Sequence, residues 1–333
     1  MKVAVIGAGS WGTALAMQLA RAGNDVRMWD HRAERAARME AERCNTRYLP
    51  DFAFPDNLHV FGDMSQALAE VGLVVEVIPS QSVRTVMTRA APLIPADAII
   101  CCASKGIEAG TLMTMEEVLM EVFPAERHQQ LNYLAGPSFA REVAGDLPTT
   151  VVIAGRDEGN AQRVADAFHA GNFRVYHTED IVGAELGGAL KNIIAIACGV
   201  ADGIGLGLNA RAALMTRGLA EISRLAIARG ANPLTLSGLA GMGDLVLTCT
   251  GNLSRNRRVG LGLGQGKTLK VICEELGQVA EGVVTTRTAR ELAQRSGVEM
   301  PITEQMYQVL YEDKPVPLAM RDLMGRQRRA ERG

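Results

Sequence analysis

Up to about residue 180, short apolar runs rich in β-branched residues alternate with segments of helical period. The apolar runs predict strands, and the segments between them, such as 11–21, 82–91 and 160–168, predict helices. The predicted strands are KVAVIG, DVRMWD, LVVEVIP, AIICCAS, LNYLAG and TVVIAG. This alternation is typical of a mostly parallel sheet covered by helices on both faces. Segment 45–63, which contains prolines and several turn formers, predicts an irregular loop.

The hydrophobic pattern changes after the sequence FRVYHTED. From Ile181 onward nearly every segment has helical period, with glycine-rich breaks at 203–207, 238–243 and 260–266. We therefore expect two domains, an α/β domain over residues 1–180 and an all-α domain over residues 181–333. Ligand sites lie preferentially at domain interfaces, so we expect the functional site in the cleft between the two domains.

Composition narrows the classes of partner. The chain has 333 residues, 47% of them hydrophobic, which is enough for two sizeable cores. Its 35 basic and 37 acidic residues leave a net charge of −2, so no overall field draws it to nucleic acid or an anionic membrane. We expect a small-molecule partner. Six cysteines without CxxC spacing indicate reduced thiols in a cytoplasmic protein, namely Cys44, Cys101, Cys102, Cys198, Cys249 and Cys273.

Two segments resemble membrane signals in composition. Residues 1–20 have the lysine and apolar run of a signal peptide, but glycines interrupt the run, and a strand followed by a turn explains it better. Residues 181–201 are long enough to span a bilayer. However, Glu185 and Lys191 would each cost about 2.5 to 3.5 kcal/mol near a bilayer centre. We interpret this segment as a core helix and expect no integral membrane segment.

The first chemical motif is a GxGxxG pattern formed by Gly7, Gly9 and Gly12. It follows a predicted strand and opens a predicted helix. In that setting Gly7 permits a tight turn, Gly9 lets the backbone approach a pyrophosphate, and Gly12 lets the helix pack on the strand. Free N–H groups at the start of the helix would then meet the phosphate charge. The motif predicts a Rossmann-like domain that binds a dinucleotide.

Residues after the second predicted strand bear on which dinucleotide binds. Asp30 ends this strand, where an acid would accept hydrogen bonds from the adenosine ribose hydroxyls. His31 and Arg32 follow directly and could meet a 2′-phosphate. The acid favours NAD and the basic residues favour NADP, so the choice between the two cofactors stays open.

Two other motifs are near misses. GLGLGQGKT ends like a phosphate-binding P-loop, but the glycine it requires is replaced by Leu261 and no strand precedes it, so we interpret it as a loop between helices. The terminal sequence RQRRAERG, residues 326–333, is basic enough for a nucleic-acid arm. Arginines at a helix end are more commonly solvated and favoured by the helix dipole, and we prefer that interpretation.

A proton-transfer group in the helical half cannot be a histidine, because all five histidines precede residue 180, and no Cys/His cluster predicts a zinc site. Lys191 stands in the apolar stretch GGALKNIIAIACG. Gly187 and Gly188 lie one turn before it on the same face and predict an open pocket around the ammonium. Burial disfavours the charged form of lysine and would lower its pKa toward the range useful for proton transfer. A snorkelling or salt-bridged lysine is the alternative.

Two further groups of polar residues are candidates. Asp244, in AGMGDLVLT, lies in apolar surroundings and would need a partner such as a lysine or a substrate hydroxyl. In NLSRNRR, Ser254 is a candidate helix N-cap, so that Arg255 and the first free amides could hold a phosphate. A plain surface cap is the alternative.

These motifs together resemble one family, the NAD(P)-dependent glycerol-3-phosphate dehydrogenases of bacterial type. The resemblance runs from Met1 to about Arg326 and includes GAGSWGTALA, ASKGIE, AGPSFAREV, LGGALKNIIAIACGVADGIGLGLNARAALMTRGLAEISRL, AGMGDLVLTCTGNLSRNRR, VAEGVVTT and VEMPITEQMYQVLY. It implies a Rossmann-like domain followed by a helical one, usually in a homodimer. It also implies reversible reduction of dihydroxyacetone phosphate by NAD(P)H to sn-glycerol 3-phosphate, the backbone of phospholipids.

The resemblance also implies residue roles. Lys191 would transfer the proton, Lys105 would help to polarise the carbonyl, and Asp244 would orient the substrate hydroxyl or Lys191. The implied substrate contacts are Lys105, Gly136, Ser138, Lys191, Asp244, Ser254, Arg255 and Asn256. Together with the candidates above, the cofactor contacts are Gly7, Gly9, Ser10, Trp11, Gly12, His31, Arg32, Lys105, Ala140, Arg255, Val279 and Glu281. No metal is implied.

Some features stay open. Glu76 places a charge in a strand that should be buried, and the pattern offers no reason for it. Asp30 stands where a small neutral residue would ease NADP binding, so a strict NADPH preference does not follow. Two other functions share parts of this pattern, a 3-hydroxyacid or 6-phosphogluconate dehydrogenase and a non-catalytic dinucleotide sensor. The expected phosphate contact of Ser254 to Asn256 and the AGMGDL sequence argue against the other dehydrogenases. In a sensor Lys105, Lys191 and Asp244 would have no function, which argues against that alternative.

Overall fold

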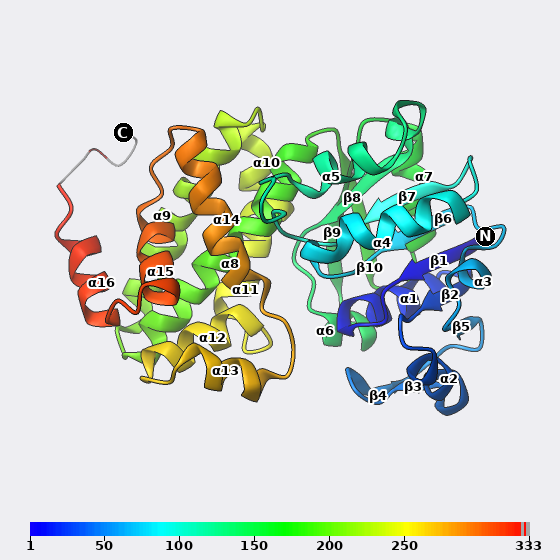
Figure 1. The fold of residues 1–333 in the computed structure, drawn as a ribbon, viewed down its shortest axis with the longest axis horizontal. Coiled ribbons are helices and arrows are strands. Elements are labelled where there is room, and N and C mark those ends of the chain that lie inside the picture. The colour runs from blue at the N-terminus through cyan, green and yellow to red at the C-terminus, as the bar shows by residue number, and fades with distance from the viewer. Residues whose placement is uncertain (328–329, 331–333) are drawn as a thin grey trace.

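The computed structural model describes residues 1–327 and 330 and shows two domains side by side (Figure 1). The N-terminal domain contains an eight-stranded sheet of order β10-β9-β8-β7-β6-β1-β2-β5, in which only β8 and β9 pair antiparallel. The predicted mostly parallel sheet is therefore confirmed. The strands are β1 (Lys2–Ile6), β2 (Asp25–Trp29), β5 (Leu58–Phe61), β6 (Leu73–Glu76), β7 (Ile99–Cys102), β8 (Leu131–Ala135), β9 (Thr149–Gly155) and β10 (Phe173–Thr178).

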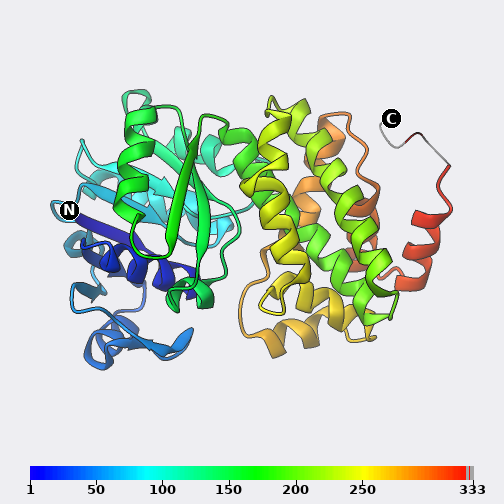
Figure 2. The ribbon, with the colours of Figure 1, turned by 180° about the vertical axis from the view of Figure 1, so that it is seen from behind.

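Helices cover both faces of this sheet, as the two opposite views show (Figures 1 and 2). Successive residues of β1 explain why the strands read as continuous apolar runs. Val3 and Val5 pack into the core on one face, whereas Ala4 and Ile6 pack into the core on the other. The main helices of the domain are α1 (Ser10–Arg21), α2 (Ala33–Glu42), α3 (Met64–Leu68), α4 (Val83–Ala90), α5 (Met115–Val122), α6 (Ala140–Ala144) and α7 (Glu158–Phe168).

The expectation of an irregular loop over 45–63 was wrong. The chain there forms a two-stranded antiparallel ribbon of β3 (Cys44–Asn45) and β4 (Leu49–Ala53), and β5 then joins the main sheet beside β2. Pro50 is accommodated in β4 because the ribbon has only two strands, so one side of each is an edge. Leu58 and Val60 alternate with exposed His59, a period-two pattern that the prolines obscured.

The C-terminal domain is built around helix α8 (Ile181–Gly203). This helix is long and apolar enough to cross a membrane, but 89% of its most apolar 18-residue window is buried inside the protein, as in a core helix. Within the described residues, every regular element after β10 is helical. The others are α9 (Gly207–Ala228), α10 (Pro233–Ser237), a π-helical turn η4 (Leu239–Gly243), α11 (Asp244–Thr250), α12 (Arg255–Gly264), α13 (Leu269–Leu276), α14 (Glu281–Arg295), α15 (Pro301–Tyr311) and α16 (Val316–Met324).

Glycines let helices α8 and α12 approach closely. A Cβ added at Gly199 would lie 2.0 Å from the carbonyl oxygen of Arg257, and one added at Gly260 would lie 1.9 Å from that of Ile196. The predicted break at 260–266 is therefore wrong as far as residue 264, because these glycines belong to a helix whose packing requires them. Of the basic terminal sequence 326–333, Arg328, Arg329 and residues 331–333 lie outside the described residues.

Candidate active site

The glycine-rich turn follows β1 at the point where the strand order of the sheet reverses, with β2 on one side of β1 and β6 on the other. Gly7 has a φ of 118°, and a Cβ there would lie 2.3 Å from the carbonyl oxygen of Val77 after β6. A Cβ on Gly12 would lie 1.8 Å from the carbonyl oxygen of Gly7. A Cβ on Gly9 would meet nothing within 4 Å. Two glycines thus permit close packing, while the third faces open space.

This geometry suits a dinucleotide. Gly9 is the N-cap residue of α1, and no side chain caps the helix, so the first amide groups of α1 are free to bind an anion. Ligands of open α/β sheets bind outside the carboxyl ends of strands at such a reversal of order. The residues present therefore fit the pyrophosphate of NAD(P).

The end of β2 differs from the arrangement expected for a ribose contact. The side chain of Asp30 is buried, and its Oδ1 accepts a hydrogen bond of 2.8 Å from the backbone N–H of Arg32. Its Oδ2 accepts a bond of 2.7 Å from Nε of Arg35. Asp30 therefore holds its own loop, whereas His31 and Arg32 are exposed.

The chemical centre joins three side chains from distant parts of the sequence. Lys191 lies in the middle of α8, Lys105 in the turn after β7, and Asp244 at the start of α11. The Nζ of Lys191 donates to Oδ1 of Asp244, and the Nζ of Lys105 donates to Oδ2 at 2.7 Å. Asp244 is 1% exposed and Lys191 is 7% exposed. Asp244 is therefore paired with two lysines, Lys105 from the N-terminal domain and Lys191 from the C-terminal domain.

Burial decides the acid–base character of Lys191. Removal from water lowers its pKa to about 8, because it disfavours the ammonium form. The carboxylate of Asp244 opposes this shift, and the neighbouring ammonium of Lys105 adds to it. Lys191 thus combines the salt bridge of the alternative interpretation with a pKa close to the range in which proton transfer is efficient.

Gly187 and Gly188, which were expected to leave an open pocket beside Lys191, instead make room for other parts of the protein. A Cβ on Gly187 would lie 2.6 Å from the carbonyl oxygen of Ala240, and one on Gly188 would lie 3.4 Å from the side chain of Lys105. The predicted open pocket at these glycines is wrong, because the protein itself fills that space. The small residues admit the π-helical turn that leads into Asp244, and they admit Lys105.

The expected phosphate-binding residues lie at the start of α12. Ser254 caps this helix by accepting a hydrogen bond of 3.2 Å from Arg257 N–H. Arg255 is exposed and lies in the electrostatic field of Glu281 and Tyr48, which belong to different domains. Asn256 is buried, and its amide nitrogen donates to Asn192 at 2.8 Å while its oxygen accepts from Gly282 at 3.0 Å. Arg255 is therefore the accessible member of the group.

Backbone atoms after β8 complete one wall of the centre. The carbonyl oxygen of Gly136 accepts a hydrogen bond of 3.4 Å from Nζ of Lys105 and one of 3.1 Å from Oγ of Ser138. Ala140 begins α6 directly afterwards. The AGPSF segment thus lies against the lysine and carboxylate cluster.

The two domains also meet at the predicted nicotinamide end. Glu281, the first residue of α14, accepts hydrogen bonds from the Oγ of Ser80 at 2.7 Å and from the N–H of Ser80 at 3.3 Å. Ser10 donates to Gln278 at 3.4 Å, next to the exposed Val279. Trp11 is partly buried against the N-terminal core. Sequence reasoning missed Ser80, although a serine after a strand-ending proline was a usable signal.

No group of three His, Cys, Asp or Glu side chains is placed to hold a metal ion among the described residues. All six cysteines are free thiols. Two of them, Cys101 and Cys102, are buried in β7.

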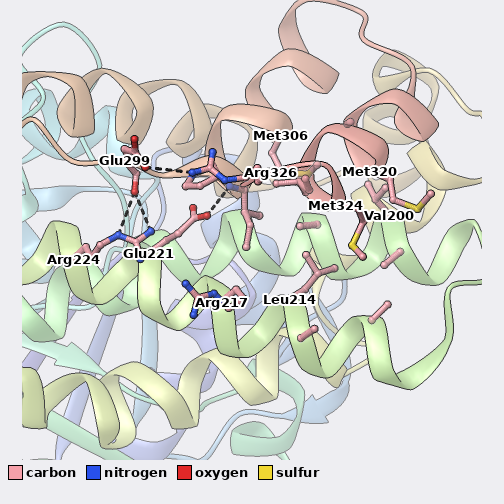
Figure 3. A pocket seen from close by; sticks show the side chains of 18 of the residues that line it. Val200, Leu214, Arg217, Glu221, Arg224, Glu299, Met306, Met320, Met324 and Arg326 are labelled. Atoms are coloured by element: carbon pink, nitrogen blue, oxygen red, sulfur yellow. Dashed lines mark hydrogen bonds and ion pairs between the residues drawn. The ribbon is translucent and has the colours of Figure 1, made fainter. Parts of the chain in front are cut away.

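A second hollow lies in the helical domain, away from this centre (Figure 3). It has a volume of about 1040 Å³ and lies between α8, α9, α15 and α16. Val200, Leu214, Met306 and Met320 contribute to its apolar walls, and charged side chains gather at one end. There Arg326 pairs with Glu299 at 3.3 Å, and Arg224 donates to the Glu299 carbonyl oxygen.

Comparisons with known proteins agree on one family. The family models for the N-terminal and C-terminal parts of NAD-dependent glycerol-3-phosphate dehydrogenase match residues 2–161 and 180–321. The glycerol-3-phosphate dehydrogenase [NAD(P)+] of Geobacter sp. (strain M21) is 53% identical over 330 residues, which cover 99% of this chain and 98% of that protein. The protein of that name from Anaeromyxobacter sp. (strain K) is 54% identical over 99% of this chain and 100% of its own length.

Solved structures agree as well. The crystal structure of glycerol-3-phosphate dehydrogenase from Coxiella burnetii matches with a TM-score of 0.92 and 42% identity, covering 98% of this chain and 99% of that chain. A glycerol-3-phosphate dehydrogenase from Saccharomyces cerevisiae matches with a TM-score of 0.82 and 28% identity, covering 98% of this chain and 99% of that one.

Proposed function

The chain belongs to the NAD-dependent glycerol-3-phosphate dehydrogenase family, and from this premise we propose how its residues interconvert dihydroxyacetone phosphate and sn-glycerol 3-phosphate. When bound, the nicotinamide cofactor supplies or accepts the hydride. The protein must then bind the substrate phosphate, exclude water, and deliver or remove one proton at the substrate oxygen. The observation that carries the proposal is the convergence of Lys105, Lys191 and Asp244 between the domains.

Lys191 is the proton donor in the reductive direction. Hydride addition to the ketone carbon leaves an alkoxide, which needs a cationic acid beside it. With a pKa of about 8, Lys191 carries a proton at neutral pH and can release it without a large penalty. In the reverse direction neutral Lys191 takes the hydroxyl proton.

Lys105 polarises the substrate carbonyl, and Asp244 positions the two lysines. The ammonium of Lys105 adds positive charge where the carbonyl oxygen gains negative charge in the transition state. Asp244 bridges both lysines, which fixes their separation and keeps two cations together in a buried place. Asp244 also lies where it can orient the substrate hydroxyl.

Arg255 holds the substrate phosphate and reaches the cofactor. Its guanidinium is the exposed cation at the N-terminus of α12, where the helix dipole also favours an anion. Ser254 and Asn256 support this group, Ser254 through its cap and Asn256 through its bridge from α8 to α14. Ser138 and the Gly136 backbone complete the substrate side.

For the cofactor, we propose that Gly7, Gly9 and Gly12 hold the pyrophosphate with Ser10 and Trp11. Ala140, Val279 and Glu281 contribute at the nicotinamide end. The geometry at β2 supports use of NADPH, because both oxygens of Asp30 accept hydrogen bonds, from Arg35 and from the backbone N–H of Arg32, while the side chains of His31 and Arg32 are exposed. Arg32→Ala should then raise the KM for NADPH more than the KM for NADH. An equal rise for both cofactors would contradict a 2′-phosphate contact.

The direct test is an assay of purified protein with dihydroxyacetone phosphate and either NADH or NADPH, followed at the nicotinamide absorbance. Oxidation of at least one cofactor is expected. Absence of oxidation with both, when cofactor binding is measurable by fluorescence, would favour the dinucleotide sensor. Turnover of a 3-hydroxyacid in place of the phosphorylated ketone would favour the other dehydrogenase class.

We also propose a homodimer formed through the second hollow and the helices around it. Support comes from large apolar side chains that line this hollow and are exposed, namely Leu206 at 39%, Ile227 at 46% and Met324 at 82%. Sedimentation should show a dimer for the wild type and a smaller mass for Ile227→Asp. The same mass for both proteins would contradict this assignment. The free thiols support a cytoplasmic location, and glycerol 3-phosphate would serve phospholipid synthesis.

A further inference from the structure

Glu76 is a fully buried acid in the centre of the sheet that the proposed reaction does not use. It ends β6, between β1 and β7, and its exposed fraction is 0%. Its nearest neighbour across the β1 side is Ile6, and the one across the β7 side is Cys102. A charged carboxylate in such surroundings is costly unless it is paired with a cation or neutralised.

The contacts of Glu76 connect two turns of the active site. Its Oε1 accepts a hydrogen bond of 2.9 Å from the N–H of Ile78, in the turn after β6. The same oxygen lies 2.6 Å from Oγ of Ser104, the residue directly before Lys105. Its Oε2 accepts from the thiol of Cys102 at 2.9 Å. One side chain thus connects the strand ends that carry the nicotinamide-side turn and the lysine turn.

Both turns lead directly to functional residues. Ile78 lies against the glycine-rich turn, because a Cβ on Gly7 would be 3.0 Å from its side chain. Two residues later Ser80 binds Glu281 across the cleft. On the other side, Ser104 is followed by Lys105, whose ammonium reaches Asp244. A shift at Glu76 would therefore move Lys105 relative to the cofactor site.

The number of protons available for the hydrogen bonds around Ser104 indicates the protonation state of Glu76. The hydroxyl oxygen of Ser104 accepts a hydrogen bond of 3.1 Å from the N–H of Ile78, and the hydroxyl contacts two acceptors, Oε1 of Glu76 and the carbonyl oxygen of Ile78. One hydroxyl proton can serve only one of them. If Ser104 donates to the Ile78 carbonyl, the short contact with Glu76 requires a proton on the acid. The neutral acid then donates to Ser104 and still accepts from the Ile78 N–H and the Cys102 thiol.

The electrostatic surroundings agree with a neutral acid. Burial raises the pKa of Glu76, and the carboxylate of Glu281 acts in the same direction, although the hydrogen bonds lower it. The other titratable groups acting on it are the thiols of Cys101 and Cys102, which do not supply a cation.

We propose that Glu76 is a positioning residue that, as a neutral carboxylic acid, locks the Ser104–Lys105 turn to the Ile78–Ser80 turn and so sets Lys105 for carbonyl polarisation. This inference rests on the role proposed for Lys105. The wild-type assay and a Lys105→Met variant test that role separately, so each idea can fail alone.

Three variants test the lock. Glu76→Leu removes every hydrogen bond of Glu76 while filling its space and leaves the two turns joined through Ser104 and Ile78. It should lower kcat roughly tenfold with little change in the KM for cofactor. Glu76→Gln keeps a donor toward Ser104 and an acceptor toward Cys102, while the N–H of Ile78 retains Oγ of Ser104 as its acceptor at 3.1 Å, so this variant should restore kcat to within about threefold of the wild type. Ser104→Ala should lower kcat at least as much as Glu76→Leu, because it also removes the bonds between Ser104 and Ile78. The double variant should lose less than about twofold more than Ser104→Ala, because both changes break one lock. Cys101→Ala, a buried change on the opposite face of β7, is the matched control and should leave kcat unchanged.

Several results would overturn the proposal. If kcat of Glu76→Gln is as low as that of Glu76→Leu, the role requires an ionised carboxylate. If the fold-losses in kcat from the Glu76 and Ser104 changes multiply in the double variant, the two residues do not share one lock. Glu76→Leu with normal kcat and only a lower unfolding temperature would make the residue structural. If Glu76→Leu does not fold, the pH profile of Glu76→Gln decides. An unchanged profile supports the neutral acid, and a shifted apparent pKa contradicts it.

Discussion

The glycine-rich turn and the lysine–carboxylate cluster are assigned to the same proposed reaction, but they are built from different parts of the chain. The turn consists of backbone within Gly7–Gly12, and its shape follows from the absence of side chains. The cluster consists of side chains at residues 105, 191 and 244, which come from three elements in two domains. In the proposed function a local motif therefore makes the cofactor cradle, whereas the chemistry depends on the way the domains meet.

The two regions also differ in electrostatics. The cradle offers uncharged N–H groups that act through the helix dipole. The cluster buries two ammonium groups around one carboxylate, so its charges depend strongly on burial and on each other. Substitutions in the cluster should consequently change the chemistry, whereas substitutions in the cradle should change packing and cofactor binding.

The largest effect is expected from Lys191→Met, which keeps the apolar stem and removes the ammonium. Loss of a general acid lowers kcat by about 10²- to 10⁴-fold. Cofactor binding, measured by nicotinamide fluorescence, should stay close to normal because the cradle is intact. Lys267→Met, at an exposed ion pair with Glu275, is the matched control and should keep full activity. If kcat of Lys191→Met remains within about threefold of the wild type, Lys191 is not the proton donor.

A smaller and different effect is expected from Arg255→Met. Loss of a charge-assisted contact to phosphate is worth about 1.5 to 3 kcal/mol, or roughly 10- to 150-fold in the KM for dihydroxyacetone phosphate. Turnover at saturating substrate should change little, because the phosphate is remote from the reacting carbon. Steady-state kinetics separate the two constants. A fall in kcat at constant KM would be inconsistent with a phosphate contact.

The pH dependence should reflect the buried lysine. Below a pKa of about 8 Lys191 is protonated and can donate, so kcat/KM for ketone reduction should be level at neutral pH. Above that pKa it should fall about tenfold per pH unit. The oxidation of glycerol 3-phosphate needs the neutral amine, so its kcat/KM should rise until pH reaches about 8 and then level off. Two profiles that bend in the same direction would show that another group limits the reaction.

The same contrast explains how much could be predicted from the sequence. The parallel sheet and the function of Gly7 and Gly12 follow from periodicity and local sterics, since each depends on residues a few positions apart. The strand β5 was missed because prolines nearby suggested a loop, although its alternation of buried and exposed residues was readable. Local pattern identified Lys191 as unusual.

The surroundings of Lys191 could not be predicted in the same way. Gly187 and Gly188 implied empty space, and only the tertiary fold shows that Ala240 and Lys105 occupy it. Likewise the buried acid Glu76 had no local explanation, because its partners Cys102 and Ser104 lie 26 and 28 residues away on the next strand and turn. Long-range pairing of polar groups leaves little trace in periodicity.

The smallest predicted effect separates two glycines of the cradle. In Gly12→Ala the added Cβ would lie 1.8 Å from the Gly7 carbonyl oxygen, so the turn or the helix must shift. Overpacking of this kind costs about 1 to 3 kcal/mol, which for a domain of this size lowers the thermal unfolding midpoint by roughly 2 to 4 °C per kcal/mol.

In Gly9→Ala the Cβ would enter open space, so the midpoint without cofactor should not fall. The new methyl group should instead weaken the binding of NAD(P)H and reduce the stabilisation that the cofactor provides. Thermal unfolding of both variants with and without NADPH distinguishes these effects. A destabilised Gly9→Ala that still gains full stability from cofactor would mean that the free face of Gly9 is not where the pyrophosphate binds.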